Sequence, residues 1–275
     1  MKIHLFALCL WAVLSAFADV DGLLATMEDS SAGYRARIAA IHSLPPDMSE
    51  GQIGRCHAFL RSRLERQPLA DLEFNALKNE LVFVLMRQNH GTEGLAGLLL
   101  EMYRDNTMDI IWRDYCLQFF GKWYPRAPRN QWREEMADEL WLALREGRRG
   151  RLAGTAASQL AFLAGKYPAF PQEKVAARCL EALLSPDCAV VSQVALLQAC
   201  AELGCSEALP LARRLAENGR DAIVRASAIA AVGMLGDASD IPLLERLAGS
   251  GDTRVGKPAA AALARMRKGR LDNKE

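Results

Sequence analysis

Cysteine and histidine are the residues of this chain best suited to nucleophilic chemistry, and one such pair is adjacent: Cys56 and His57. Neighbouring side chains on a helix point about 100° apart, so this thiol and imidazole need a partner from elsewhere in the fold. The other histidines after residue 18, His42 and His90, lie in distant segments. We therefore predict no catalytic residue and no enzyme activity; an enzyme or enzyme subunit that uses an exposed thiol is the alternative.

The six cysteines that follow residue 18 lack the spacing of a metal site. They contain no Cys-x2-Cys pair, and no His-x3-His pair follows them, so the sequence predicts neither a metal site nor a cofactor. An even number of cysteines in an exported chain allows disulfides. Cys200 could pair with Cys205 across a helix end, and Cys179 could pair with Cys188 to join a helix to the next one.

Tryptophans are concentrated in one part of the chain. Four of the five lie between residues 112 and 141: Trp112, Trp123, Trp132 and Trp141. Exposed tryptophans often anchor protein interfaces. On a helix over 131–145, Trp132 and Trp141 fall at the two margins of the apolar face, where side chains are half-buried. These two are the best aromatic candidates for contact with a partner, and packing in the core is the alternative.

The densest basic cluster comes directly after this helix. It consists of Arg145, Arg148, Arg149 and Arg151. Guanidinium groups bind carboxylates and phosphates through paired hydrogen bonds, so the cluster could hold an acidic protein, an anionic sugar or a phosphate. Alternatively, it is a solvated loop whose positive charges stabilise the negative end of the preceding helix.

Residues 1–18 have the pattern of a secretory signal peptide. Lys2 precedes an apolar run from Ile3 to Phe17, and small residues stand at Ala16 and Ala18. A membrane anchor is the alternative, but a run of about 15 residues is short for a span and no basic cluster follows. We expect cleavage after Ala18, export to the periplasm or the extracellular space, and no stable membrane insertion of the mature chain.

Charge excludes two classes of partner. The 275 residues contain 34 Lys and Arg against 33 Asp and Glu, and removal of residues 1–18 takes away one lysine, which leaves 33 − 33 = 0. Binding to nucleic acid or to an anionic membrane depends on an excess of cations. We therefore expect neither, and the hydrophobic content of 51% predicts a folded chain with a substantial core.

Apolar residues recur at helical spacing along the chain, and no run with the period of a strand is long enough to predict a sheet. Two short helices, 23–27 and 34–44, should form an N-terminal capping segment over 19–48 that ends at Pro45-Pro46. A helical repeat domain should then occupy 49–275. Its expected helices are 49–65, 72–88, 92–104, 110–124, 131–145, 152–165, 172–184, 188–203, 206–216, 222–235, 239–247 and 254–267.

The C-terminal helices repeat. Asp221 is equivalent to Asp252 at an offset of 31 residues. Asp109 and Arg113 match Asp221 and Arg225 at an offset of 112 residues. Equivalent positions in successive helix pairs are Leu85, Phe120, Leu163, Leu203, Leu235 and Met266. Their periods of about 31 to 43 residues are typical of an all-α solenoid, here of about six helix pairs.

The block from Val224 to Leu247 carries a family resemblance. Its Val-Arg pair, its Leu-Gly-Asp turn and its Ile-Pro-Leu-Leu helix start resemble the HEAT repeat, in the short HEAT-like form also found in bilin lyase subunits. The similarity covers about 190–268 and does not extend to the first 48 residues. It implies an armadillo-type scaffold with a concave, protein-binding face lined by the second helix of each pair. It assigns no catalytic residue to this chain.

These observations lead to one preferred function. We expect a non-catalytic, exported scaffold that binds another protein through the concave face of a HEAT-like solenoid. The thiol-dependent enzyme or enzyme subunit and a structural component of the cell envelope are the alternatives.

Overall fold

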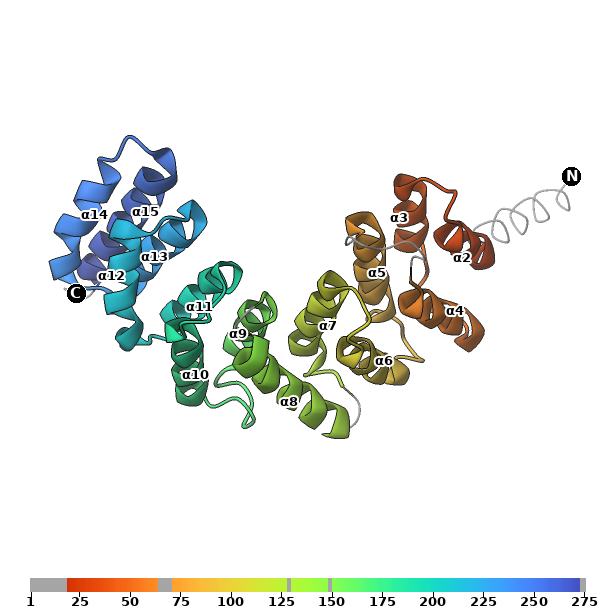
Figure 1. Ribbon diagram of the computed structural model, residues 1–275. Coiled ribbons are helices and arrows are strands. Elements are labelled where there is room, and N and C mark those ends of the chain that lie inside the picture. The colour runs from red at the N-terminus through yellow and green to blue at the C-terminus, as the bar shows by residue number, and fades with distance from the viewer. Residues whose placement is uncertain (1–18, 64–70, 128–129, 148–149, 273–275) are drawn as a thin grey trace, which may run out of the picture. The chain divides into compact units, whose positions relative to one another are not determined.

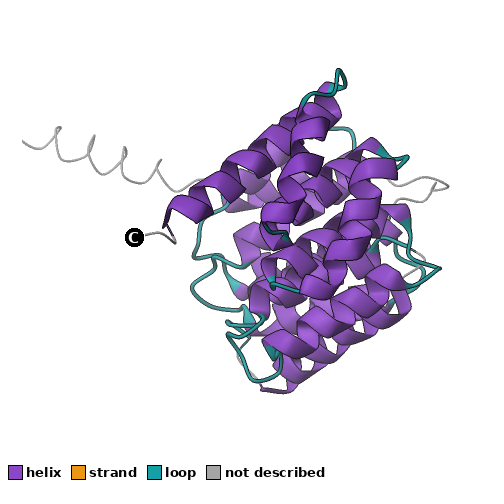
Figure 2. Cartoon of the chain, turned by 90° about the vertical axis from the view of Figure 1, so that its left-hand side faces the viewer, coloured by secondary structure: helices purple, strands orange, loops and turns teal. Residues whose placement is uncertain are grey.

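The structure is a computed structural model that describes residues 19–63, 71–127, 130–147 and 150–272. Every regular element in these ranges is helical, and loops join the helices (Figure 1, Figure 2). The α-helices are α2 (Val20–Glu28), α3 (Tyr34–His42), α4 (Glu50–Arg61), α5 (Leu72–Leu85), α6 (Glu93–Arg104), α7 (Ile110–Trp123), α8 (Asn130–Glu146), α9 (Leu152–Leu163), α10 (Gln172–Leu184), α11 (Val190–Glu202), α12 (Leu209–Asn218), α13 (Ala222–Leu235), α14 (Ile241–Ala248) and α15 (Thr253–Asp272). Short 3-10 turns, η2 (Ser206–Ala208) and η3 (Ala238–Asp240), precede α12 and α14.

The chain forms two compact units, and each consists of stacked helix pairs. Unit 1 contains Met1–Cys116 and Arg126–Trp132; unit 2 contains Leu117–Pro125 and Arg133–Glu275. In unit 1, the first helices α2, α4 and α6 pack in succession, and the second helices α3 and α5 pack together. In unit 2, the second helices α9, α11, α13 and α15 pack in succession. This layering of like helices confirms the predicted all-α solenoid.

The N-terminal segment forms a helix pair that packs on the next pair. Its helices α2 and α3 pair with each other, and they pack on α4 and α5 as a repeat would. Leu24, Met27 and Met48 are fully buried. The described helices therefore form seven pairs: the N-terminal pair α2–α3 and the six pairs from α4–α5 to α14–α15, which correspond to the six predicted second helices.

Aspartates begin several of the helices, because the first turn of a helix leaves backbone N–H groups without partners. The Asp221 carboxylate accepts hydrogen bonds from the N–H groups of Ile223 and Val224 at 2.9 and 3.0 Å. Asp109 likewise accepts from Ile111 at 2.6 Å. The aspartates that revealed the repeat in the sequence are thus helix caps.

An arginine of the second helix binds the end of the first helix in three of the pairs. The Nε of Arg225 donates to the carbonyl of Ala216 at 2.8 Å, and the Nε of Arg113 donates to that of Tyr103 at 2.7 Å. Arg37 makes the same contact with Met27 at 2.9 Å. A helix ends with unpaired carbonyls and a partial negative charge, so a cation here satisfies an acceptor and stabilises the end of the helix dipole. This recurring contact aligns the two helices of these three pairs, and it explains why Arg113 and Arg225 are equivalent in sequence.

In the α4–α5 pair, a lysine one turn later takes this place. Asn75 stands four residues after the capping Asp71, as Arg225 follows Asp221, and its side-chain Nδ2 has no hydrogen-bond partner. Lys78 instead donates from Nζ to the carbonyl of Ser62 at 2.6 Å. Its ammonium also lies 4.7 Å from the centre of the Phe74 ring. Lys78 is 2% exposed, and this burial lowers its pKa to about 8.

Replacement of Arg225 by methionine should destabilise unit 2 by about 2 kcal/mol. The substitution keeps most of the apolar stem but leaves the carbonyl of Ala216 without its charged donor. Urea denaturation of the variant measures the change. The matched control is Arg220→Met, since Arg220 is exposed. Equal stabilities of the two variants would show that the contact does not hold the pair together.

Lys78 should make the stability of unit 1 depend on pH. Between about pH 8 and the ordinary lysine pKa of 10.5, the unfolded chain holds a proton on Lys78 that the folded chain has released, so the free energy of unfolding rises with pH. The free energy of unfolding of the wild type should therefore rise by about 3 kcal/mol relative to that of Lys78→Met from pH 7 to pH 11. Denaturation at both pH values measures this difference, in which the effects of titratable groups that do not interact with Lys78 cancel. A constant difference would contradict the lowered pKa.

Candidate functional site

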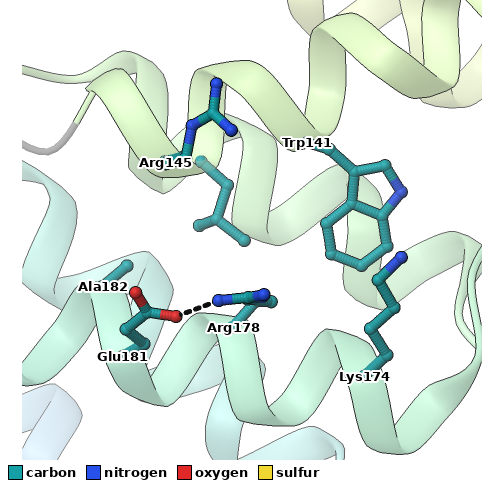
Figure 3. Close-up of a pocket in the computed structure, with 7 residues that line it drawn as sticks. Trp141, Arg145, Lys174, Arg178, Glu181 and Ala182 are labelled. Carbon is teal, nitrogen blue, oxygen red and sulfur yellow. Dashed lines mark hydrogen bonds and ion pairs between the residues drawn. The ribbon is translucent and has the colours of Figure 1, made fainter.

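A pocket of about 250 Å³ lies between α8 and α10 in unit 2 (Figure 3). It is lined by Trp141, Leu144, Arg145, Lys174, Arg178, Glu181 and Ala182. Leu144 and Ala182 are buried, at 2% and 4% exposure, and form its apolar base. The charged side chains are exposed and surround the opening. The pocket therefore combines an apolar interior with a charged rim.

Helical periodicity places these residues on two facing surfaces. Trp141, Leu144 and Arg145 have the spacing i, i+3, i+4 on α8, which puts them on one face. On α10, Lys174, Arg178 and Ala182 follow one another at intervals of four residues. Figure 3 shows Trp141 and Lys174 facing each other across the gap between the helices, Arg178 lying along α10 toward Glu181, and the guanidinium of Arg145 pointing away from α10.

The pocket carries more positive than negative charge. Three cations, Arg145, Lys174 and Arg178, line it together with one carboxylate, that of Glu181. The Nη1 of Arg178 donates to Glu181 at 2.5 Å, and the Nη2 of Arg145 donates to Glu146 at 3.0 Å. More than half of each of these four side chains is exposed, so the pairs are weak and can exchange for other anions at little cost.

The indole of Trp141 is held from two sides. The ammonium of Lys174 lies 4.8 Å from its ring centre. The ring of Phe170 lies 6.2 Å away, and Phe170 is fully buried beside Tyr124, with their ring centres 5.0 Å apart. Gly165 permits the loop that delivers Phe170, since its φ is +71° and its N–H donates to the Phe170 carbonyl at 3.0 Å. Trp141 is consequently a half-buried aromatic surface on a fixed support.

The structure separates the six residues predicted as partner-binding. Trp141 and Arg145 both line the pocket. Trp132 belongs to unit 1 and does not line it: a Cβ at Gly97 of α6 would lie 2.2 Å from its ring, so the indole packs directly over this glycine. Trp132 is nevertheless half-buried like Trp141, as the margins of the apolar face predicted. Arg151 is half-buried just before α9, and Arg148 and Arg149 lie outside the described residues.

Sequence reasoning missed Lys174, Arg178 and Glu181. The sequence pattern that could have indicated them is the exposed face of a strongly amphipathic helix, on which cations stand four residues apart. Such a face is typical of solvated helices in general. The local pattern gave no indication that α10 faces α8.

The four cysteines predicted to form disulfides are thiols in the structure. Cys200 and Cys205 lie together at the end of α11, where their side chains share a hydrogen bond and the N–H of Cys205 donates to the Cys200 carbonyl at 2.9 Å. Cys179 interacts electrostatically with Cys200 and Cys205. Cys188 is half-buried in the loop before α11. Disulfide formation by these cysteines stays a prediction.

Burial makes the thiols poor nucleophiles. It raises the pKa of Cys56 and of Cys179 to about 12, and it also raises those of Cys116 and Cys200. The thiolate, which is the reactive form, is therefore scarce near neutral pH. Burial also lowers the pKa of His57, whose Nε2 has no hydrogen-bond partner. No cluster of three His, Cys, Asp or Glu side chains that could hold a metal ion occurs among the described residues.

Comparison with known proteins identifies the repeat. A family model described as HEAT repeats matches residues 176–264, which run from within α10 to within α15. This segment consists of HEAT repeats. The match confirms the resemblance seen at Val224–Leu247, and no curated protein matches the chain. Among the described helices, none is both long and apolar enough to cross a membrane.

The HEAT match includes only one side of the pocket. Arg178, Glu181 and Ala182 lie within the matched segment, whereas Trp141 and Arg145 come from the preceding pair. Both helices of the pocket, α8 and α10, are the first helices of their pairs. The pocket is therefore not on the layer of second helices that the resemblance implied as the binding face.

Proposed function

We propose that this protein is a non-catalytic scaffold that binds another protein, and that the pocket between α8 and α10 anchors the partner. HEAT repeats suggest a protein-interaction scaffold. The position of the binding site is inferred from Trp141, a half-buried aromatic ring beside an apolar cavity and three cations. Tryptophan and arginine are the residues most often found at the energetic centres of interfaces.

The rigid support of Trp141 favours binding. A side chain that is already fixed loses little conformational freedom when a partner packs on it. Trp141 is held between Lys174 and Phe170, and Leu144 and Ala182 beneath the pocket are part of the helix packing. A partner that covers this surface gains contact area without first ordering it.

The chemistry of the chain supports binding rather than catalysis. The titratable side chains of the pocket are exposed, and Arg145, Arg178 and Glu181 lie in ordinary ion pairs. The buried thiols are elsewhere and are protonated near neutral pH.

Export is the second part of the proposal. The signal-like segment, residues 1–18, lies outside the described residues, so its pattern of a basic residue, an apolar run and Ala16-Phe17-Ala18 supports export from the sequence alone. We propose a periplasmic or extracellular location, where the protein would meet its partner.

Substitution of Trp141 by alanine should weaken partner binding about 30-fold, as expected for loss of a central anchor worth about 2 kcal/mol. The partner is first isolated by affinity capture with the purified protein, and its affinity for each variant is then measured. Phe162→Ala is the matched control. Phe162 is also an exposed aromatic with a lysine over its ring, at 4.0 Å from Lys166, but it lies on the second helix α9.

The two variants separate the two candidate faces. Loss of affinity only in Phe162→Ala would place the partner on the second helices and would contradict the proposed anchor. Wild-type affinity in both variants would exclude both sites.

A further inference from the structure

We propose that the pocket between α8 and α10 recognises an acidic peptide segment of the partner, in which one apolar side chain is flanked by carboxylates. This inference rests on the proposed scaffold function and specifies the chemistry of its ligand. The apolar side chain would enter against Leu144, Ala182 and the edge of Trp141. The carboxylates would bind the cations at the rim, Arg145, Lys174 and Arg178.

The size of the pocket matches a side chain. A cavity of about 250 Å³ has room for one large side chain together with several water molecules. Because Leu144 and Ala182 offer no hydrogen-bonding side chains, water there loses partners. Displacement of this water by a phenylalanine or leucine side chain is favourable.

The position of Lys174 restricts the route of entry. Its ammonium lies over the ring of Trp141, as Figure 3 shows, and covers part of that face. The rest of the lining includes Leu144, Arg145 and Arg178. Because both arginines line the pocket, acidic residues beside the entering apolar group in sequence can reach their guanidinium groups.

The arginines can donate hydrogen bonds to a new carboxylate while they keep their present partners. Arg178 contacts Glu181 through Nη1, and Arg145 contacts Glu146 through Nη2. A guanidinium has five N–H donors, and its planar fork binds a carboxylate through two of them. With three cations against one carboxylate in the lining, the pocket favours an anionic ligand.

The same features disfavour other anions. A phosphate or a nucleic-acid backbone would use the cations but not the apolar base, and binding of nucleic acid requires a larger excess of positive charge than this chain has. A small aromatic carboxylate shares the chemistry but contacts fewer cations at once than a segment with several acidic residues. The experiment therefore includes it as a competitor.

Fluorescence anisotropy with three labelled peptides tests the proposal. The first has a central phenylalanine flanked by two glutamates on each side; the second has glutamines in place of the glutamates, and the third has alanine in place of phenylalanine. The first should bind at least tenfold more tightly than the other two, and its affinity should fall as salt rises. Benzoate serves as the small competitor.

Variants locate the site. The double variant Arg145→Gln, Arg178→Gln should bind the first peptide at least tenfold more weakly than the wild type does. Lys257→Gln with Arg265→Gln is the matched control, since it removes two charges from exposed positions of α15. All four positions are exposed, so both double variants should keep the wild-type thermal stability. Equal weakening by both double variants would mean that net charge, rather than this pocket, binds the peptide.

Other results would overturn the proposal. These are equal affinity for the glutamate and glutamine peptides, no binding of any peptide, or displacement of the first peptide by benzoate at a concentration similar to its own. If no peptide binds but Trp141→Ala still weakens the captured partner, the ligand class is wrong and the scaffold function stands. If Trp141→Ala also leaves the partner's affinity unchanged, both proposals fail.

Discussion

The structure depends on how the backbone carbonyls at the end of the first helix of a pair obtain hydrogen-bond donors. An isolated helix ends with carbonyls that lack partners, and a buried end of this kind is costly. In four pairs a cation from the second helix supplies the donor: Arg37, Lys78, Arg113 and Arg225. Because the donor and the acceptor belong to different helices, this contact sets how the helices of a pair lie against each other. The apolar layers that stack pair on pair then have a defined register.

Sequence predicted that the positions are equivalent where the repeat is regular, but not the contact itself. Asp221 and Arg225 recur at Asp109 and Arg113 with the same separation, and both arginines make the same contact in the structure. Lys78 could not be found in this way, since it stands one turn beyond the expected position and Asn75 occupies that position. Arg37 was missed because the first pair shares this contact without sharing the rest of the motif.

The candidate site shows the same limit. The margins of the apolar face of α8 identified Trp132 and Trp141 as equivalent candidates, because periodicity reports only one helix at a time. Their difference comes from neighbouring helices: Gly97 leaves space that the Trp132 ring fills, whereas Lys174 and Arg178 turn the surroundings of Trp141 into a charged pocket. Gly97 lies on α6, and Lys174 and Arg178 lie on α10. No local sequence pattern relates these residues to α8.

The central claim is that a partner binds the first helices at the pocket, and hydrogen exchange with the captured partner bound and absent tests it most directly. Backbone amides of α8 and α10 near Trp141, Arg145 and Arg178 are at the proposed interface, while α13 and α15 are not. The account predicts that the partner slows exchange in α8 and α10 and leaves α13 and α15 unchanged. Slower exchange confined to the second helices α9, α11 and α13 would contradict it.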